Sequence, residues 1–140
     1  MVGVPVDPDI ESTIAIDRDS DIITARQRGR ELAASIGFTR TDQTLIATAI
    51  SEVARNILVY AMRGKVVLRL VEADGRRGIV VEASDHGPGI ADIELALRDG
   101  YSTTKSLGLG LPGSRRMMDD LTIESTLGEG TIVTMKRWVR

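Results

Sequence analysis

The sequence has 140 residues, of which 42% are hydrophobic and only 3% aromatic, and 18 Lys and Arg nearly balance 20 Asp and Glu. This length predicts one domain that buries about two-thirds of its unfolded surface, and a net charge of −2 argues against a nucleic-acid partner. The absence of cysteine excludes disulfides and thiolate chemistry, and the single histidine, His86, excludes a metal site with two His ligands.

The N-terminal part predicts an arm, a strand and a helix. Residues 1–10 contain two prolines and are expected to form a flexible arm, followed by one domain over residues 11–140. Residues 12–17 alternate weakly between apolar and polar, as in an edge strand. We find no signal-like start and no run of 18 apolar residues. We therefore expect a soluble, cytoplasmic protein without a membrane partner.

A first helix is expected to follow that strand. Asp19, Ser20 or Asp21 can cap it, and it should run to about residue 36, where Gly37 would close it. Gly29 in its middle either weakens the helix or marks a close packing contact.

The second helix has the clearest pattern in the sequence. Thr41 or Asp42 should cap it, and its apolar residues fall within one arc of the helical wheel: Leu45, Ile46, Ala49, Ile50, Val53 and Ile57. Glu52 and Asn56 lie four residues apart at the edge of this arc, so their side chains project together. Such a pair can be a site or simply two polar residues at a core boundary.

The second half of the chain predicts two hairpins with helical segments between them. Residues 65–74 and 79–84 should pair around a turn at 74–78, and residues 121–126 and 131–139 around a turn at 127–130. Between the hairpins we expect a short helix over 91–98, a Gly- and Ser-rich lid over 99–110, and a helix from 111 or 112 to about 120. This order predicts an α+β two-layer sandwich, with helices covering one face of a mixed, mostly antiparallel sheet.

A carboxylate followed by a glycine-rich turn comes directly after one of these strands. Asp85 is followed by His86 and then by Gly87-Pro88-Gly89. Proline stiffens the turn, and the glycines allow positive φ and close approach of a ligand. The stretch is either an ordinary strand-to-helix connection or a ligand site with Asp85 beside a bare surface.

Four short motifs are spaced along this one domain: Glu52-x-x-Arg55-Asn56, Asp85-x-Gly87-x-Gly89-Ile90, Gly108-Leu109-Gly110-Leu111 and Gly128-x-Gly130-Thr131. The cluster at 108–111 opens a helix, where backbone N–H groups can receive phosphate. It is not a Walker loop, since no Gly-Lys-Ser/Thr is present, and it does not follow a strand as a Rossmann turn would.

The order and spacing of these motifs resemble the nucleotide-binding boxes of the GHKL family, which includes gyrase, Hsp90, sensor histidine kinases and MutL. The resemblance covers about residues 40–135. Within the family, the runs 42–57 (DQTLIATAISEVARNI), 85–90 (DHGPGI), 99–113 (DGYSTTKSLGLGLPG) and 128–131 (GEGT) look closest to the RsbT-like anti-sigma-factor serine/threonine kinases. The implied fold is the GHKL (Bergerat) ATP-binding sandwich.

The resemblance implies ATP and Mg²⁺ as cofactors and assigns roles to individual residues. Asn56 would coordinate Mg²⁺ at the phosphates, Glu52 would be the catalytic base, and Asp85 would accept a hydrogen bond from the adenine amino group. Residues around the base and the phosphates would complete the nucleotide site: Gly87, Gly89, Ile90, Lys105, Gly108, Gly110, Leu111 and Thr131. The role of Arg55 stays open between phosphate and partner protein, and His86 is interpreted as a solvated loop residue.

The resemblance also implies partners. The substrate would be a STAS-domain antagonist protein phosphorylated on serine or threonine, and a second output would be activation of a partner phosphatase in a stress-response cascade. The alternatives are a non-catalytic interaction module, a module that binds a sigma factor directly, a detached histidine-kinase ATP domain and a fragment of a DNA-linked ATPase. Glu52 argues against the first, because a protein that only binds has no need of a base. The sequence leaves the oligomeric state open.

Overall fold

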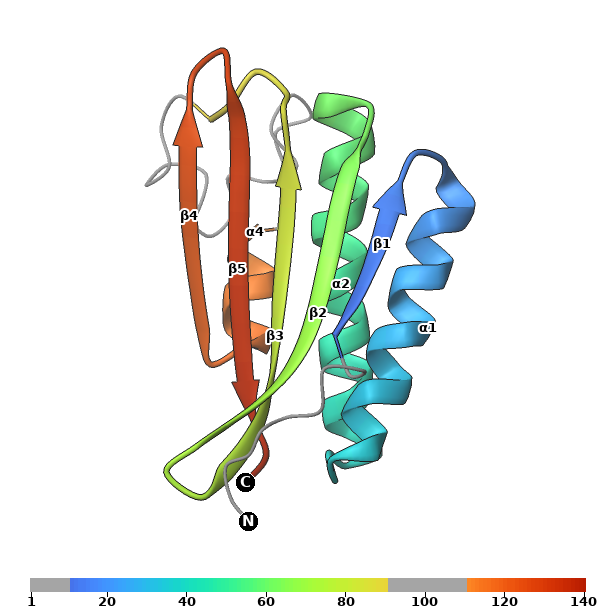
Figure 1. Cartoon of the computed structure of the whole chain (residues 1–140), viewed down its shortest axis with the longest axis vertical. Coiled ribbons are helices and arrows are strands. Elements are labelled where there is room, and N and C mark those ends of the chain that lie inside the picture. Colours follow the sequence, from blue (N-terminus) through green and yellow to red (C-terminus); the bar gives the residue numbers. More distant parts are fainter. Residues whose placement is uncertain (1–10, 91–110) are drawn as a thin grey trace.

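A single sheet backed by helices makes up the computed structural model, which describes residues 11–90 and 111–140. The elements in chain order are β1 (Ser12–Ile16), α1 (Asp19–Ser35), α2 (Arg40–Ala61), β2 (Gly64–Ala73), β3 (Arg76–Asp85), α4 (Leu111–Met117), β4 (Asp120–Thr126) and β5 (Gly130–Trp138). The strand order is β1-β2-β3-β5-β4, and each of these pairings is antiparallel. The helices lie on one face of the sheet (Figure 1), so the predicted two-layer α+β sandwich is confirmed. The expected arm (1–10), short helix (91–98) and lid (99–110) lie outside the described residues.

The core forms between α2 and the helix-facing side of the sheet. Alternate residues of β2 and β3 point toward the helices and are almost fully buried: Val66, Leu68, Leu70, Ile79 and Val81. From the predicted arc of α2, all members are buried except Leu45, which is half-buried. Ala47 and Ala54 are buried as well, because α2 packs against α1 on one side and the sheet on the other. The arc is therefore wider than the sequence predicted.

Contacts with α1 on one side and with the sheet on the other make α2 unusually apolar. Among the described residues it is the one helix long and apolar enough to cross a membrane, with a mean hydropathy of 1.2 over 18 residues. It is not a run of 18 apolar residues, however, because Glu52, Arg55 and Asn56 interrupt it, so the expectation from the sequence is not contradicted. Its apolar residues belong to the core of the sandwich, so α2 is a core helix of this fold.

The helix starts differ by a few residues from those predicted. Thr39, and neither Thr41 nor Asp42, caps α2, because its hydroxyl oxygen accepts the N–H of Asp42 at 3.1 Å. α1 begins at Asp19, and the carboxylate of Asp21 accepts the N–H groups of residues 17 and 18 from within the first turn. The cap position of α1 is Arg18 and not one of the three predicted residues. Short polar side chains occupy several positions around each helix start, so sequence alone does not select the one that caps it.

The first hairpin turns more tightly than predicted. Asp74 and Gly75 both have positive φ (53° and 77°) and form a two-residue turn, as Asp-Gly pairs favour. Gly78 belongs to β3 and not to the turn, since it pairs with Val71 of β2. Glycine fits there because a Cβ would lie 2.6 Å from the ring of Trp138. The second hairpin is confirmed within one residue at its strand starts, whereas α4 ends at Met117 and not near residue 120.

Gly29 is explained by helix packing, and its replacement tests this contact. A Cβ at Gly29 would overlap the Cδ1 atom of Ile50 on α2, so we expect Gly29→Ala to destabilise the fold by about 1–3 kcal/mol, as overpacking does. Gly113→Ala is the matched control: no atom lies within 4 Å of its added Cβ. Because alanine is a better helix former, that control should be neutral or slightly stabilising. Urea unfolding of both variants measures the difference, and equal stabilities would contradict the packing role.

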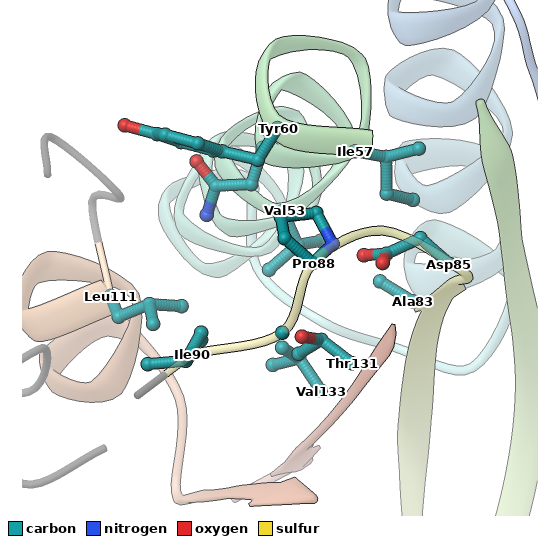
Figure 2. A pocket seen from close by; sticks show the side chains of 12 residues that line it. Val53, Ile57, Tyr60, Ala83, Asp85, Pro88, Ile90, Leu111, Thr131 and Val133 are labelled. Atoms are coloured by element: carbon teal, nitrogen blue, oxygen red, sulfur yellow. The ribbon is translucent and has the colours of Figure 1, made fainter. Parts of the chain in front are cut away.

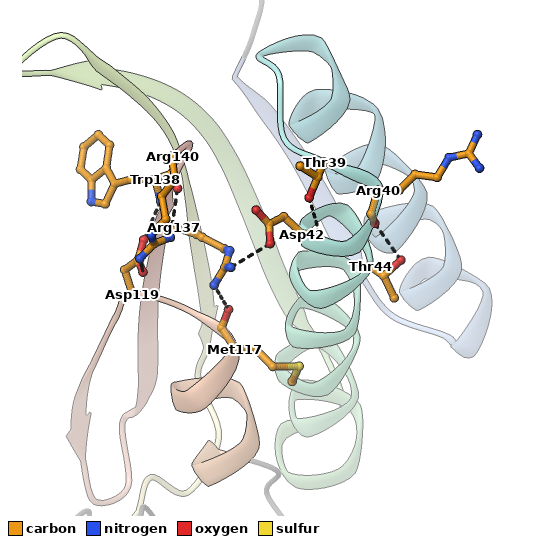
Figure 3. A network of polar contacts seen from close by, with 9 residues as sticks. All are labelled: Thr39, Arg40, Asp42, Thr44, Met117, Asp119, Arg137, Trp138 and Arg140. Carbon is orange, nitrogen blue, oxygen red and sulfur yellow. Dashed lines mark hydrogen bonds and ion pairs between the residues drawn. The ribbon is translucent and has the colours of Figure 1, made fainter.

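Arg137 ties three elements together at the end of the molecule where α2 begins (Figure 3). One of its terminal nitrogens donates to Asp42 Oδ1 on α2 at 2.9 Å, and the other donates to the carbonyl of Met117 in α4 at 2.7 Å. Its side chain is only 14% exposed. The guanidinium therefore fixes β5 and α4 against the N-terminal turn of α2.

Asp119 links the C-terminal residues to α4 and predicts a pH dependence of stability. Burial by itself raises the pKa of Asp119, but hydrogen bonds from Arg140 and the Trp138 N–H, together with the charge of Arg137, lower it overall. The folded carboxylate thus binds a proton less readily than the unfolded one. Its stabilisation is present above the unfolded pKa, near 4, and is lost as the pH falls through the lowered folded value.

We therefore expect Asp119→Asn to be less stable than wild type at pH 7 and the gap to shrink below about pH 4. Chemical unfolding between pH 7 and pH 3 measures the gap, with Asp120→Asn, an exposed neighbour, as control. A gap that stays constant down to pH 3 would contradict the assignment.

Candidate functional site

A cavity lies between the C-terminal half of α2, the end of β3, the Gly-Pro-Gly turn and the start of β5 (Figure 2). Leu111, the first residue of α4, closes one wall and is 1% exposed. The lining residues are Val53, Asn56, Ile57, Tyr60, Ala83, Asp85, Pro88, Gly89, Ile90, Leu111, Thr131 and Val133. Most of them are apolar, and the few polar groups converge from different elements, which is the usual composition of a small-molecule site.

Three motif residues that are far apart in the sequence meet in this cavity. Asn56 comes from α2, and Asp85 and Thr131 come from β3 and β5. Asp85 and Thr131 are direct partners in the antiparallel register. Their Cβ atoms are thus expected about 4.5–5.5 Å apart on the same face of the sheet. The structure therefore brings together an amide, a carboxylate and a hydroxyl from three of the four motifs.

The two oxygens of Asp85 are in different situations. Oδ1 accepts the N–H of Gly87 at 2.8 Å and closes the first bend of the turn. Oδ2 accepts no hydrogen bond from the described part of the chain. Figure 2 shows the carboxylate directed toward the cavity. One oxygen therefore shapes the turn, and the other is left for a donor in the cavity.

The Gly-Pro-Gly turn is held against both neighbouring layers. A Cβ at Gly87 would lie 2.6 Å from Ala61 of α2, and one at Gly89, whose φ is +82°, would lie 2.6 Å from the carbonyl oxygen of Thr126. The carbonyl of Pro88 accepts the N–H of Gly128 at 2.8 Å. Contacts within the protein thus already require both glycines, and their predicted contact with a nucleotide base stays a prediction.

Glu52 lies outside the cavity lining, one helical turn before Asn56. Its carboxylate forms an ion pair with Arg55 at 3.3 Å, and its side chain is 33% exposed. Arg55, whose role the sequence left open, therefore contacts Glu52 here. Because residues four apart on a helix face the same way, Glu52 and Asn56 project side by side.

The remaining predicted residues divide into two groups. Ile90 and Leu111 line the cavity, as the motif order implied. Lys105, Gly108 and Gly110 lie outside the described residues, so their predicted contacts with phosphate stay predictions. No group of three or more His, Asp or Glu side chains in residues 11–90 and 111–140 is arranged to hold a metal ion. A cation at Asn56 would thus depend on phosphate oxygens for most of its ligands, as Mg²⁺ commonly does in nucleotide sites.

Several residues of the site were not predicted. Val53, Ile57 and Tyr60 form an apolar wall on α2, and their spacing of four and three residues gives a signal that could have found them. Ser125 lies behind the cavity on β4, where its hydroxyl contacts Thr131 Oγ1 at 2.9 Å and accepts the N–H of Ile90 at 2.7 Å. The pairing of β4 with β5 around the turn at 127–129 places it there.

The family of the chain follows from comparison with known proteins. The model of the histidine kinase-like ATPase domain matches residues 17–137, which include all of the cavity. The chain belongs to this family. The catalytic domain of the histidine kinase ThkA, in a nucleotide-free form, has a similar fold, with a TM-score of 0.51 and 16% identity over 90% of this chain and 95% of that one.

Two relatives show to which members of this family the chain is similar. The serine/threonine-protein kinase RsbT of Bacillus subtilis (strain 168) is 45% identical over 93% of this chain and 98% of its own length. The anti-sigma F factor of Thermoanaerobacter sp. (strain X514) is 32% identical over 76% of this chain and 78% of its own. The predicted resemblance is therefore confirmed: the chain is an RsbT-like serine/threonine kinase with an ATP-binding domain.

Proposed function

We propose that the chain transfers the γ-phosphoryl group of Mg·ATP to a serine or threonine of a STAS-domain antagonist protein and thereby switches partners in a stress-response cascade. The observation that carries the proposal is the meeting of Asn56, Asp85 and Thr131 on one mostly apolar cavity. Each comes from a different motif of the nucleotide-binding pattern. The family and its serine/threonine kinase members supply the reaction type.

The cavity is proposed to hold the adenine base. The free oxygen of Asp85 accepts a hydrogen bond from the exocyclic amino group, and the hydroxyl of Thr131, its cross-strand partner, lies beside it. Val53, Ile57 and Val133 offer apolar surface to the ring. A planar, mostly apolar base with one outward donor fits this distribution of groups.

Asn56 is proposed to be the protein ligand of Mg²⁺. Its amide oxygen is a hard donor of the kind Mg²⁺ accepts, and no carboxylate cluster in residues 11–90 and 111–140 competes for the ion. An ion held there would supply positive charge against the negative charge that develops on the phosphoryl group during transfer. Asn56 thus orients the phosphates relative to the base held by Asp85.

Glu52 is proposed to accept the proton of the attacking hydroxyl. It projects from the same helix face as Asn56 but outside the base cavity, as a group acting at the phosphate end would. Its exposure of 33% leaves it accessible to a side chain of another protein. The oxygen of the substrate serine or threonine gives up its proton to the carboxylate while it attacks the γ-phosphorus, and the bond from the γ-phosphorus to the β–γ bridging oxygen breaks, so that ADP leaves.

The proposal is tested by transfer of ³²P from [γ-³²P]ATP to purified STAS-domain proteins encoded near this protein, with Mg²⁺ present. We expect label on serine or threonine of one of them and no label when EDTA removes the metal. The same partner should bind the kinase less tightly after phosphorylation, and the released kinase should then bind a phosphatase in a pull-down. Cytoplasmic location is part of the proposal and can be checked by fractionation.

A second candidate is a protein that holds a sigma factor directly. The similarity to anti-sigma F factors favours it, since the one from Thermoanaerobacter sp. (strain X514) matches 76% of the chain. A sigma factor retained by the immobilised chain, with no label on any STAS protein, would support this candidate. Retention of the sigma factor by a chain that does not bind ATP would indicate a non-catalytic module.

A further inference from the structure

An exposed stripe runs along α2 and changes in chemistry at Glu52. Before it, the stripe carries Thr44 and Thr48, whose hydroxyls donate to carbonyls one turn earlier and so have partners within the helix. Beyond it, the stripe carries Val59, which is 61% exposed, and Met62, the C-cap residue, which is 78% exposed. Spacings of three, four and seven residues place these side chains on one face of the helix. The apolar half of the stripe therefore begins one to two turns beyond the proposed base.

Met62 is unfavourable for the fold in two ways. Its φ of +72° lies in the left-handed region, where a helix end usually has glycine and where a long side chain is strained. Its side chain is exposed and is not part of the core. A methionine that the fold does not need, at a position that suits glycine, indicates a role outside the fold. Methionine is well suited to contact another protein, since its flexible thioether adapts to the surface of a partner.

The charges that flank these two apolar residues are positive. Arg55 precedes Val59 by one turn, and its side chain is 53% exposed. Arg63 follows Met62, is exposed, and has no ion-pair partner within the part of the chain that the structure describes. An acidic group brought to Arg55 would compete for its ion pair with Glu52 and so free the carboxylate for an attacking hydroxyl. This half of the stripe is therefore complementary to an apolar segment with carboxylates on either side.

We infer that Val59 and Met62 form a docking stripe for the protein substrate. Arg55 and Arg63 are its positive flanks, so the substrate segment that binds it is apolar with acidic residues on either side. The inference rests on the proposed kinase function. Continuity with Glu52 supports this occupant, because the distance along α2 from the proposed base to Met62 is about 15 Å. A protein whose hydroxyl reaches Glu52 covers this side of α2, whereas a phosphatase donates no hydroxyl and has no such need.

Met62→Gly is the decisive variant, because glycine suits the positive φ and the free energy of unfolding should stay unchanged or rise. Initial rates of ³²P transfer are measured at saturating Mg·ATP against the concentration of the STAS-domain protein that wild type labels. Met62→Gly and Val59→Ser should each raise KM for that protein by about 10-fold, as loss of one interface anchor does, with little change in kcat. Leu127→Ser removes a similarly exposed apolar side chain (66%) from the turn between β4 and β5 and should change neither constant.

The acidic flanks of the substrate segment are tested by salt. Arg63→Glu should raise KM for the same protein at about 0.05 M salt and lose most of that effect at about 0.5 M, where exposed charges are screened. Arg40→Glu makes the same change at the exposed first residue of α2 and should leave KM unchanged. An effect of Arg63→Glu that does not depend on salt would contradict the acidic flanks.

Three other results would overturn a proposal. An unchanged KM in both Met62→Gly and Val59→Ser, or a loss confined to kcat, would overturn the docking stripe. Loss of phosphatase binding in a pull-down, with KM for the substrate unchanged, would overturn the choice of occupant. Failure of wild type to label any STAS-domain protein would overturn the proposed function, and the docking stripe with it.

Discussion

Asp85→Asn is expected to weaken ATP binding by about 10–100-fold while the fold stays intact, because a hydrogen bond to a charged acceptor is lost. The amide oxygen of asparagine can still accept the N–H of Gly87, which in wild type lies 2.8 Å from Oδ1. The amide nitrogen then replaces the free oxygen and turns a donor toward the adenine amino group. The substitution thus preserves the turn and reverses the polarity of the one atom proposed to read the base.

The measurement compares ATP with purine riboside triphosphate, which lacks the amino group, by calorimetry. Wild type should bind ATP much more tightly than the analogue, and Asp85→Asn should lower the affinity for ATP while sparing the analogue. Glu82→Gln is the matched control, since it makes the same chemical change on the same strand but beside Arg69 on the other face of the sheet. Normal ATP affinity in Asp85→Asn would remove Asp85 from the site and leave the adenine assignment without its main support.

The parts of the site that sequence predicted are those with a local signal. The apolar arc of α2 fixed the face on which Glu52 and Asn56 project, since helical spacing decides which side chains lie together. The Asp-Gly pair at 74–75 predicted the first hairpin, although the turn came out shorter. Asp85 was singled out because a strand ends directly before a Gly-Pro-Gly turn. In each case, residues near one another in the sequence carry the information.

The other site residues are brought together by pairing between strands that are far apart in the sequence. Asp85 and Thr131 meet only because β5 is inserted between β3 and β4, and no pattern in either segment specifies this strand order. Ser125 enters the site through the register of β4 on β5, and a shift by one residue would turn it to the opposite face. The same holds for the contact between Gly29 and Ile50, which depends on how α1 lies on α2. Tertiary contact, and not local propensity, selects these residues.

Glu52→Gln is expected to bind ATP as wild type does and to transfer phosphate about 10²–10⁴-fold more slowly, the usual contribution of a general base. The affinity should be unchanged because Glu52 is not among the residues that line the cavity. Glutamine keeps the size of the side chain and an oxygen for Arg55, so only the proton acceptor is removed. The rate is measured as ³²P transfer to the STAS partner at saturating Mg·ATP, beside Glu52→Ala.

The ion pair with Arg55 does not by itself explain such a loss. It is largely exposed, at 3.3 Å, and exposed pairs contribute about 0–1 kcal/mol, so breaking it alters stability little. Glu31 on α1 forms the corresponding pair with Arg28 at 3.1 Å, three residues apart, and neither residue lines the cavity. Glu31→Gln should therefore match Glu52→Gln in stability but retain full turnover. Unchanged turnover in Glu52→Gln would exclude Glu52 as the base. A loss of turnover without a loss of ATP affinity would show that Glu52 accepts the proton, whereas Asp85 holds the nucleotide.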